Sequence, residues 1–324
     1  MGYEAYEDVR EGHAVIVLAD REQDSIAIIV PSIGFNLIRC RLGGHETIEG
    51  PPDLATLGAR SSEFGVPLLW PPGRIAGGAF SFRGKSYVYP VHDGEYHLHG
   101  EIRMRQWQIV SLEADDENGA SATAEYRFEA TEAQGAYYPH AVLLRMHWRL
   151  TGNRISGELE AFNGGNEEAP FGFGLHPYFK FRGKPEEIEI TAPTRLQYIA
   201  DADGLNRQTP VPTELCGKLS DGMTLDLLPS DVDHFVFRMA EGSASRQMSM
   251  KDGDVRIGFE CDSGFPYLVV FKPKWADALS LEPWNCISDA YNSPLSSEWT
   301  GADAEGLRAG ERRTLGWAWQ ADKA

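Results

Sequence analysis

HAVLLRMHWRL, from His140 to Leu150, is the stretch that decides the fold class. Apolar side chains occupy every second position, and from Leu144 on arginine or histidine stands between them. The apolar positions are Val142, Leu144, Met146, Trp148 and Leu150. A period of two is typical of a β-strand that turns one face to a core and the other to solvent. This stretch therefore predicts a strand in a half-buried sheet.

Further strand patterns follow along the chain. They are RISGELEAF at 154–162, EEIEI at 186–190 and YLVVF at 267–271. The last is apolar throughout, which predicts a strand buried on both faces. QMSMKDGDVRIGFE, residues 247–260, holds Asp252-Gly253 between two strand-like arms and predicts a β-hairpin.

Helical patterns are scarce, and the best candidate, Asp53 to Ala59, is about two turns long. The 34 glycines and 19 prolines are spread as turn signals and not gathered into a linker. The sequence therefore predicts an all-β protein. We expect one domain over residues 1–324, built as a large, mainly antiparallel β-sandwich of two packed sheets.

Composition narrows the partners and the compartment. The formal net charge of −18 would repel nucleic acid and anionic membranes, so we expect neither as a partner. An acidic N-terminal stretch predicts no secretory signal, and no apolar run approaches the length of a membrane span. The four cysteines form no C-x-x-C pair and are expected to be buried free thiols. We expect a cytoplasmic protein.

Motifs for common cofactors are not found. The GFG at 172–174 begins like a dinucleotide fingerprint, but Pro177 stands where the third glycine belongs. His97 and His99 would share a face if they lay on a strand, and could then bind a metal or donate a hydrogen bond into a pocket. No cluster of cysteines or carboxylates completes a metal site near them, so we expect no metal and no cofactor.

Two ionisable residues precede prolines among aromatic neighbours. His176 lies in GLHPYF and Glu282 in LSLEPWNC. A proline restricts the residue before it to extended backbone, and apolar neighbours shift pKa values toward those of a general acid or base. Each residue also has a simpler interpretation, as a core histidine bonded to a carbonyl or as a solvent-facing glutamate. Together they suggest an acid–base pair across a pocket that suits a sugar ring.

The chain resembles the aldose 1-epimerase (galactose mutarotase) family in these two segments and in three others. The resemblance is carried by motifs in the family's order: GRIAGGAFSFRGKSY at 73–87, LHGEIRMRQW at 98–107, GLHPYF at 174–179, VDHFVF at 232–237 and SLEPWNCISDAYN at 280–292. The resemblance implies a β-super-sandwich and the interconversion of the α and β anomers of free aldoses without a cofactor.

The resemblance also implies roles for individual residues. Glu282 would be the general base at the C1 hydroxyl, His176 the general acid at the ring oxygen, and His99 a further donor near that oxygen. The residues expected to bind the sugar are Arg74, Asp233, Trp107 and Tyr178.

The sequence departs from the family pattern at several positions. Gly73 replaces the asparagine usual before Arg-Ile, which removes one hydroxyl ligand. Glu101 stands where an apolar or aromatic residue is common. The sequence assigns no role to Glu101, Arg103, Arg105 or His234. These departures leave open which sugar binds.

Alternative functions remain. A hexose-6-phosphate epimerase would need cations for the phosphate, and the candidates are Arg74, Arg83, Lys85, Arg103 and Arg105. A non-catalytic sugar-binding protein on the same scaffold would need neither His176 nor Glu282 for chemistry. A polysaccharide-processing enzyme is a further alternative. The leading hypothesis is a mutarotase for a free hexose such as glucose or galactose, acting as a monomer or homodimer.

Overall fold

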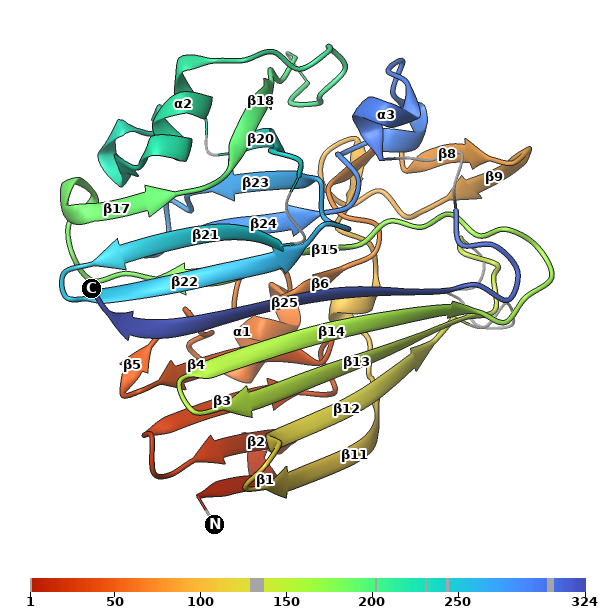
Figure 1. The fold of residues 1–324 in the computed structure, drawn as a ribbon. Helices are drawn as coiled ribbons and strands as arrows, with labels where there is room; N and C mark the ends of the chain where they lie inside the picture. Colours follow the sequence, from red (N-terminus) through yellow and green to blue (C-terminus); the bar gives the residue numbers. More distant parts are fainter. Residues whose placement is uncertain are drawn as a thin grey trace.

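Three antiparallel β-sheets make up most of the structure, which is a computed structural model (Figure 1). It describes residues 2–128, 137–201, 203–230, 232, 234–242, 245–301 and 306–324. The predicted all-β class is confirmed. Among the described residues, no helix is long and apolar enough to cross a membrane.

The largest sheet has nine strands and contains the stretch that decided the fold class. In sheet order its strands are β11 (Gln108–Asp115), β12 (Gly119–Arg127), β13 (Val142–Thr151), β14 (Arg154–Asn163), β25 (Arg312–Lys323), β22 (Val255–Asp262), β21 (Ser245–Asp252), β17 (Ile188–Thr191) and β19 (Met223–Thr224). The five apolar side chains of β13 that the sequence placed on one face are all fully buried. The period-two pattern therefore identified this strand and its core face correctly.

The seven-stranded sheet carries the candidate site. Its strands are β18 (Thr194–Tyr198), β20 (His234–Met239), β23 (Tyr267–Phe271), β24 (Ala278–Trp284), β15 (Gly174–Leu175) and β6 (Leu68–Leu69), with β16 (Tyr178–Lys180) also paired to β24. The first four residues of β23 are buried, which fits the prediction of a strand covered on both faces. Because β23 and β24 lie inside this sheet, their side chains are fixed on both sides by hydrogen-bonded neighbours.

The N-terminal residues form the five-stranded sheet. Its strands are β1 (Tyr3–Arg10), β2 (His13–Asp20), β3 (Ser25–Val30), β4 (Asn36–Leu42) and β5 (His45–Glu46). The remaining elements are the ribbons β7 (Arg74–Ala76) with β10 (Tyr96–Leu98) and β8 (Ala79–Phe82) with β9 (Lys85–Val88), and the helices α1 (Leu54–Ala59), α2 (Glu214–Asp221) and α3 (Ser297–Thr300). These short elements lie between the strands of the large sheets along the chain.

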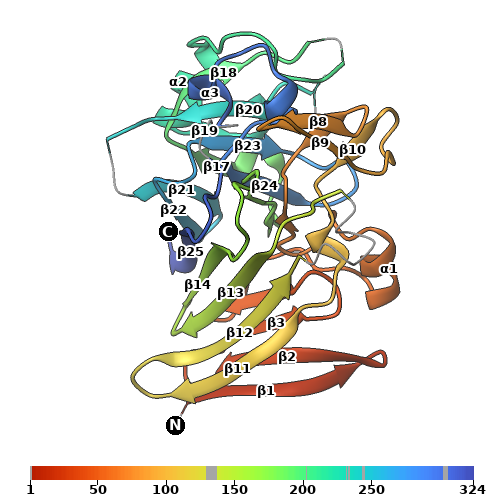
Figure 2. The same cartoon turned by 90° about the vertical axis from the view of Figure 1, so that its right-hand side faces the viewer.

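The three large sheets are arranged in two layers. The nine-stranded sheet forms one layer, and the five- and seven-stranded sheets lie next to each other in the second (Figures 1 and 2). A bridge between Ile48 and Phe179 joins the two sheets of the second layer. One core cluster takes side chains from all three sheets, among them Leu18, Trp148 and Leu281. The expected sandwich is confirmed, with the difference that its second layer consists of two sheets.

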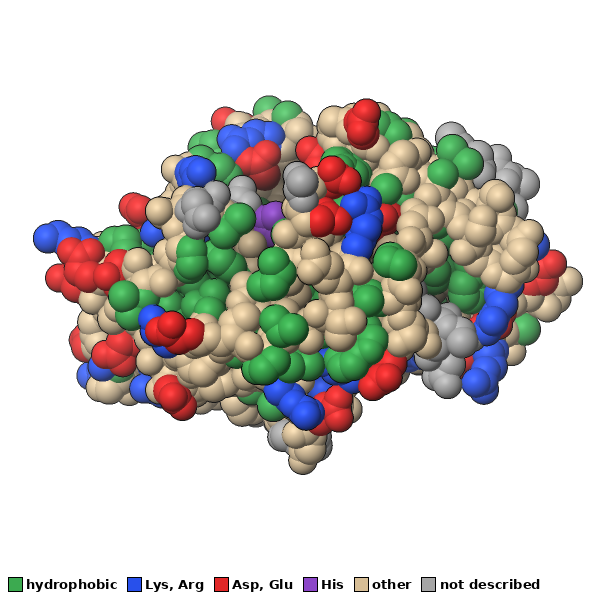
Figure 3. Space-filling model, turned by 90° about the horizontal axis from the view of Figure 1, so that it is seen from above, with side chains coloured by type: hydrophobic (Ala, Val, Ile, Leu, Met, Phe, Trp, Pro, Cys, Tyr) green, Lys and Arg blue, Asp and Glu red, His purple; other side chains and the backbone are tan. Residues whose placement is uncertain are grey.

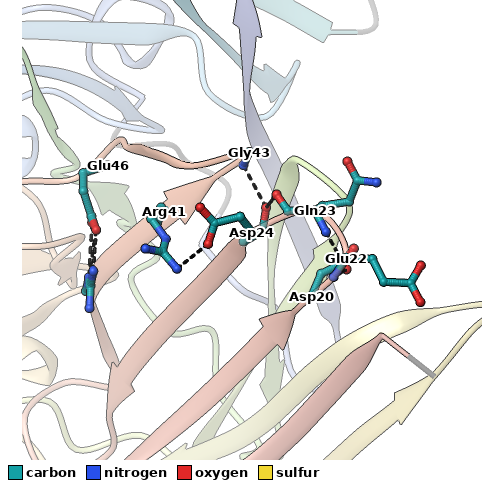
Figure 4. Close-up of polar contacts among 9 residues, drawn as sticks. Asp20, Glu22, Gln23, Asp24, Arg41, Gly43 and Glu46 are labelled. Carbon is teal, nitrogen blue, oxygen red and sulfur yellow. Dashed lines mark hydrogen bonds and ion pairs between the residues drawn. The ribbon is translucent and has the colours of Figure 1, made fainter.

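Polar contacts hold the hairpins of the N-terminal sheet (Figure 4). Asp20 accepts backbone hydrogen bonds from Glu22 and Gln23 at 3.0 and 3.1 Å, which shapes the turn between β2 and β3. Asp24, in the same turn, forms an ion pair at 2.5 Å with Arg41 on β4. These polar contacts shape the turn, while the apolar faces of the strands supply most of the stabilisation.

The helix, the hairpin and the free cysteines that the sequence predicts are present in the structure, and one predicted strand is shorter than expected. Helix α1 begins after Asp53, whose side chain accepts a hydrogen bond from the Thr56 amide at 2.6 Å, as an N-cap does. The predicted hairpin joins β21 to β22, with Gly253 at a φ of 60° in its turn. EEIEI is partly wrong, because its first residues form a 3₁₀ turn and the strand begins at Ile188. All four cysteines are free and buried.

Candidate active site

Strand alternation on β24 creates the polar floor of the site. Leu279 and Leu281 point into the main core. Ser280, Glu282 and Trp284 occupy the alternate positions and therefore the opposite face of the sheet. On β23, Val269 lies next to Glu282 in register, and both line one cavity. The sheet thus presents a carboxylate from one of its central strands toward that cavity.

The register of two neighbouring segments brings His176 to Glu282. Gly174 on β15 pairs with Trp284, and Tyr178 on β16 pairs with Ser280, both antiparallel. His176 is midway between the first two residues of these pairs, and Glu282 is midway between the second two. The two ionisable groups are therefore opposite each other across adjacent strands. Pro177 interrupts the ladder, which separates β15 from β16 at this point.

The two side chains form a buried pair in close contact. His176 Nε2 lies 3.2 Å from Glu282 Oε1, and the two residues are 5% and 1% exposed. Burial raises the pKa of Glu282 well above its ordinary value and lowers the pKa of His176 to about 3. Both shifts favour the form in which one proton is shared and neither group is charged. Such a pair can exchange a proton with a ligand without building up net charge.

The second ring nitrogen of His176 fixes the orientation of the imidazole. Nδ1 lies 2.9 Å from the hydroxyl of Ser280, and the His176 ring stacks on Tyr178 at 4.5 Å between centroids. The Tyr178 hydroxyl in turn donates to the Ser62 carbonyl at 2.8 Å. Nε2 then faces Glu282 at 3.2 Å and the Tyr178 hydroxyl at 3.4 Å. The sequence did not single out Ser280, although its place two residues before Glu282 on a strand puts it on the same face.

An open cavity of about 410 Å³ lies over this pair. Its lining residues are Ser62, Glu63, Gly73, Arg74, Leu98, His99, His176, Tyr178, His234, Val236, Val269, Phe271, Trp275, Glu282, Trp284 and Ser288. From above, Figure 3 shows a histidine side chain inside a hollow of the surface, with acidic and basic side chains mingled around it. The size and the mixed lining are typical of a site for a small polar molecule.

Two polar atoms at the floor have no hydrogen-bond partner among the described residues. They are Oε2 of Glu282, an acceptor when ionised, and Nε1 of Trp284, a donor. Both residues line the cavity and are almost fully buried. An unpaired buried polar group costs about 1–3 kcal/mol. A hydroxyl both donates and accepts hydrogen bonds, so a ligand hydroxyl can pair with Glu282 Oε2 or with Trp284 Nε1.

His99 enters the cavity from a tight left-handed turn. His99 and Gly100 have φ values of 64° and 63°, and a side chain at Gly100 would collide with the Trp70 carbonyl. The Gly73 amide donates to His99 Nδ1 at 3.1 Å. Burial, and after it the nearby His176, hold the pKa of His99 well below its ordinary value. The neutral ring therefore carries its proton on Nε2, which makes it a donor for a ligand.

The idea that His97 and His99 share a strand face is wrong. Strand β10 ends at Leu98, and the left-handed backbone at His99 turns its ring away from that of His97. His97 Nδ1 instead lies 2.8 Å from the Pro90 carbonyl. Within the ranges that the structure describes, no three His, Cys, Asp or Glu side chains form a group that could hold a metal ion.

Gly73 explains one departure from the family pattern. Its φ is 72°, and a Cβ built there would lie 2.2 Å from the Ser288 hydroxyl oxygen. Only glycine fits at this position while Ser288 keeps its place. Because Ser288 lines the cavity, its hydroxyl occupies space that a side chain at position 73 would take. A polar side chain from a distant segment therefore lies where a side chain at position 73 would begin.

The charged residues at the cavity wall have counter-charges. Arg74 donates through Nε to Asp93 at 2.9 Å, and the Arg60 guanidinium forms an ion pair with Glu63. Together with the pair at the floor, these contacts leave the cavity without an excess of either charge. Asp93 was not identified from the sequence, because nothing in its neighbourhood separates it from an ordinary turn residue.

A buried arginine supports the turn that carries His99. Arg103 is 5% exposed and donates through Nη1 to the carbonyl of Gly100. Its Nη2 lies 3.4 Å from His92 Nε2. Glu101 does not pair with it, since its carboxylate binds Arg105 at 2.8 Å. Arg103 therefore uses its charge on the backbone of the turn, whereas Arg105 completes a separate ion pair.

Five of the predicted site residues meet in the cavity, and Trp107 does not. Glu282, His176, His99, Arg74 and Tyr178 all line it. The expectation for Trp107 is wrong, because that indole is 1% exposed in the main core and donates to the Ile102 carbonyl. An aromatic at the end of a motif cannot be distinguished from core by its sequence alone. Asp233 lies outside the described residues.

Comparison with known proteins agrees with this fold. The sequence profile of the aldose 1-epimerase family matches residues 17–316. The chain belongs to the aldose 1-epimerase family. Among curated relatives of this family member, the uncharacterized protein YihR of Escherichia coli K12 is 23% identical over 78% of either chain. The uncharacterized protein YphB of the same organism is 30% identical over 155 residues, or 47% of this chain and 46% of YphB.

Solved structures share the fold at low sequence identity. A galactose mutarotase-like protein from Clostridium acetobutylicum superposes with a TM-score of 0.88 and 18% identity, over 100% of this chain and 99% of that one. A galactose 1-epimerase from Lactobacillus acidophilus gives a TM-score of 0.77 at 17% identity, over 99% and 98%. At such identities the likeness shows that this aldose 1-epimerase family member has their fold.

Proposed function

We propose that this protein is a cofactor-independent aldose 1-epimerase that interconverts the α and β anomers of a neutral free hexose, such as glucose or galactose. One observation carries the proposal. A carboxyl–imidazole pair, with Glu282 Oε1 3.2 Å from His176 Nε2, lies at the floor of an open polar cavity. The two oxygens that exchange protons in mutarotation are both bonded to C1, so an acid and a base must act side by side.

Each residue of the pair has a distinct task in this proposal. Glu282, as the carboxylate, takes the proton from the C1 hydroxyl. His176, protonated on Nε2, gives a proton to the ring oxygen as the bond between that oxygen and C1 breaks. The sugar opens to the aldehyde, the C1–C2 bond rotates, and closure on the other face returns both protons. The neutral Nε2–H of His99 donates a hydrogen bond near the ring oxygen.

The proton balance of the pair fits this cycle. The neutral resting form and the charged form, carboxylate with imidazolium, hold the same number of protons. They differ only in whether one proton is on Glu282 or on His176 Nε2. Transfer along the contact between Glu282 and His176 converts one into the other. Oε2 of Glu282 can accept a hydrogen bond from the C1 hydroxyl, and this bond stabilises the carboxylate when a sugar is present. The pair ends each turnover with the proton it started with.

The charges of the cavity favour a neutral hexose over a hexose phosphate. Arg74 is held by Asp93, and Glu63 adds a negative charge that Arg60 compensates. The other cations considered for a phosphate are not among the lining residues. Arg83 and Lys85 pair with Glu168 and Glu167, and Arg105 pairs with Glu101. A phosphate dianion would meet no free cluster of arginine or lysine here.

Polarimetry of freshly dissolved α-glucose and α-galactose tests the function. We expect catalysed approach to anomeric equilibrium, with kcat/KM at least about tenfold higher for glucose than for glucose 6-phosphate, since each 1.4 kcal/mol changes the ratio tenfold. A higher kcat/KM for the phosphate would favour the hexose-6-phosphate alternative. Sugar binding without any acceleration would favour the non-catalytic sugar-binding protein.

A second prediction concerns Arg103. Arg103→Met removes the donor to the Gly100 carbonyl, which lets the turn move and displaces His99. A displacement of about 1 Å at a catalytic group can lower kcat about 10²-fold, and we expect a loss of that order with little change in KM. The substitution leaves the buried Gly100 carbonyl without this donor, which costs about 1–3 kcal/mol, so the variant is expected to fold with a lower unfolding temperature. Steady-state polarimetry and thermal unfolding check both points.

The background variant His99→Ala makes this test specific. If Arg103 acts through His99, Arg103→Met costs little further activity once His99 is absent. Equal losses in both backgrounds would contradict this role. Arg105→Lys is the matched control, because it changes an arginine two residues away that contacts Glu101 and Tyr137 but not Gly100.

A further inference from the structure

An aromatic row runs from the floor of the cavity to its rim. The His176 ring stacks on Tyr178 at 4.5 Å between centroids, and Tyr178 contacts Trp275 at 5.5 Å. All three residues line the cavity. Tyr178 is 2% exposed, whereas Trp275 is 39% exposed. The acid–base chemistry uses only the inner end of this row, so the exposed indole at its outer end needs a separate explanation.

Trp275 is fixed in place. It lies in the loop between β23 and β24, with its ring 5.0 Å from that of Phe64. The guanidinium of Arg60 lies 5.2 Å from the indole centroid. Large aromatics packed in this way lose little freedom when a ligand binds, which makes them effective contact surfaces. The rim therefore presents a rigid aromatic surface before any ligand arrives.

Hydrogen-bonding groups stand beside this aromatic surface. Glu63 lines the cavity and forms an ion pair with Arg60, the residue that contacts the Trp275 ring. The carboxylate accepts hydrogen bonds and the guanidinium donates them. An aromatic surface with a planar donor and an acceptor close to it matches a sugar ring, which has C–H groups on its faces and hydroxyls around its edge.

The chemistry at the floor sets which end of a sugar reaches the rim. C1 and the ring oxygen must lie at Glu282 and His176. C4 is across the ring from C1, so it points away from the floor. A substituent on O4 would therefore extend outward along the aromatic row toward Trp275.

We propose that Trp275, Glu63 and Arg60 form a second sugar subsite, which binds the ring attached through O4 to the reacting hexose. The preferred substrates are then the reducing ends of 4-linked disaccharides and longer oligosaccharides. The glycosidic bond is not touched, because only the hemiacetal carbon meets the acid–base pair. This inference rests on the proposed function, since it assumes that a hexose reacts at the floor.

The kinetic test compares glucose with maltose, cellobiose and lactose, which all have a 4-substituted glucose at the reducing end. We expect kcat/KM for at least one of them to exceed that for glucose about tenfold, mainly through KM. The 6-linked isomaltose is expected to lack this advantage. In Trp275→Ala the ratio of disaccharide to glucose is expected to fall to about one. A wild-type ratio near one for all three disaccharides would overturn the proposal.

Trp299→Ala is a matched control. Trp299 is also partly exposed and also contacts an arginine, Arg238, at 5.1 Å, but it does not line the cavity. The disaccharide preference should survive this substitution. An equal loss of preference in both tryptophan variants would overturn the proposal, because it would show an effect that does not depend on the rim.

A binding test separates the subsite from the catalytic function. 1,5-Anhydroglucitol and its 4-O-glucosyl derivative lack the C1 hydroxyl and cannot open. Calorimetry is expected to show about tenfold tighter binding of the 4-O-glucosyl compound to the wild type, and no such difference for Trp275→Ala. Tight binding without mutarotation of any sugar would refute the proposed function and support the subsite. Mutarotation with equal affinity for both compounds would support the proposed function and refute the subsite.

Discussion

Glu282→Gln is expected to abolish nearly all acceleration of anomer exchange. Glutamine has nearly the same shape as glutamate and can still donate a hydrogen bond to His176 Nε2, so the pair keeps its geometry. It cannot take a proton from the C1 hydroxyl. Loss of a positioned general base lowers kcat about 10²–10⁴-fold, and we expect a loss in that range with KM changed far less. Polarimetry with fresh α-glucose measures it.

The stability of this variant provides the control. The pKa of Glu282 is raised in the folded protein, so its contribution to stability is full below the ordinary glutamate pKa and is lost as the pH rises through the folded value. Glutamine does not ionise and escapes that loss. At pH 7 the variant is therefore expected to unfold at a temperature no lower than the wild type. An inactive variant with a much lower unfolding temperature would not count in favour of the role of Glu282, and a fully active one would exclude it.

His176→Asn is expected to cause a loss of similar size for a different reason. The asparagine amide can keep the hydrogen bond to Ser280 that Nδ1 makes now, but it offers no group at the position of Nε2. The ring oxygen then loses its proton donor, and kcat should fall about 10²–10⁴-fold. Retention of more than half of the wild-type kcat would show that His176 is not the general acid.

The same variant gives a prediction about pH. Burial lowers the pKa of His176 to about 3, so between its ordinary pKa and this value the unfolded chain binds a proton that the folded protein does not. The histidine therefore destabilises the fold progressively as the pH falls from about 6.5 toward 3. Asparagine removes this effect. Urea unfolding at pH 7 and pH 4.5 should show that the variant gains stability relative to the wild type at the lower pH.

The fold could be predicted from the sequence as far as its class. The alternation on β13 and the hairpin at Gly253 could be predicted, because neighbouring residues determine strand periodicity and turn geometry. The division of one layer into two sheets could not be predicted. It depends on which distant strands pair, such as β16 with β24, and local patterns do not encode that choice.

The candidate site was predictable where the residues themselves are unusual. His176 and Glu282 stand before prolines among aromatics, and that setting identified both. Ser288 and Trp275 carry no such local signal, since their roles arise from folding. Ser288 matters because Gly73 approaches it, and Trp275 because its loop reaches the rim. Trp107 was misplaced for the same reason, as burial is a property of the whole chain.

The pairing of β15 and β16 with β24 has a consequence for how this protein matures. His176 and Glu282 meet only after the ends of a loop of roughly a hundred residues come together, which is slow compared with forming local hairpins. A partly folded chain can contain most of its strands and still lack the contact between His176 and Glu282. Under the proposed function, anomer exchange is thus expected to recover late in refolding and to report the chain that has finished folding.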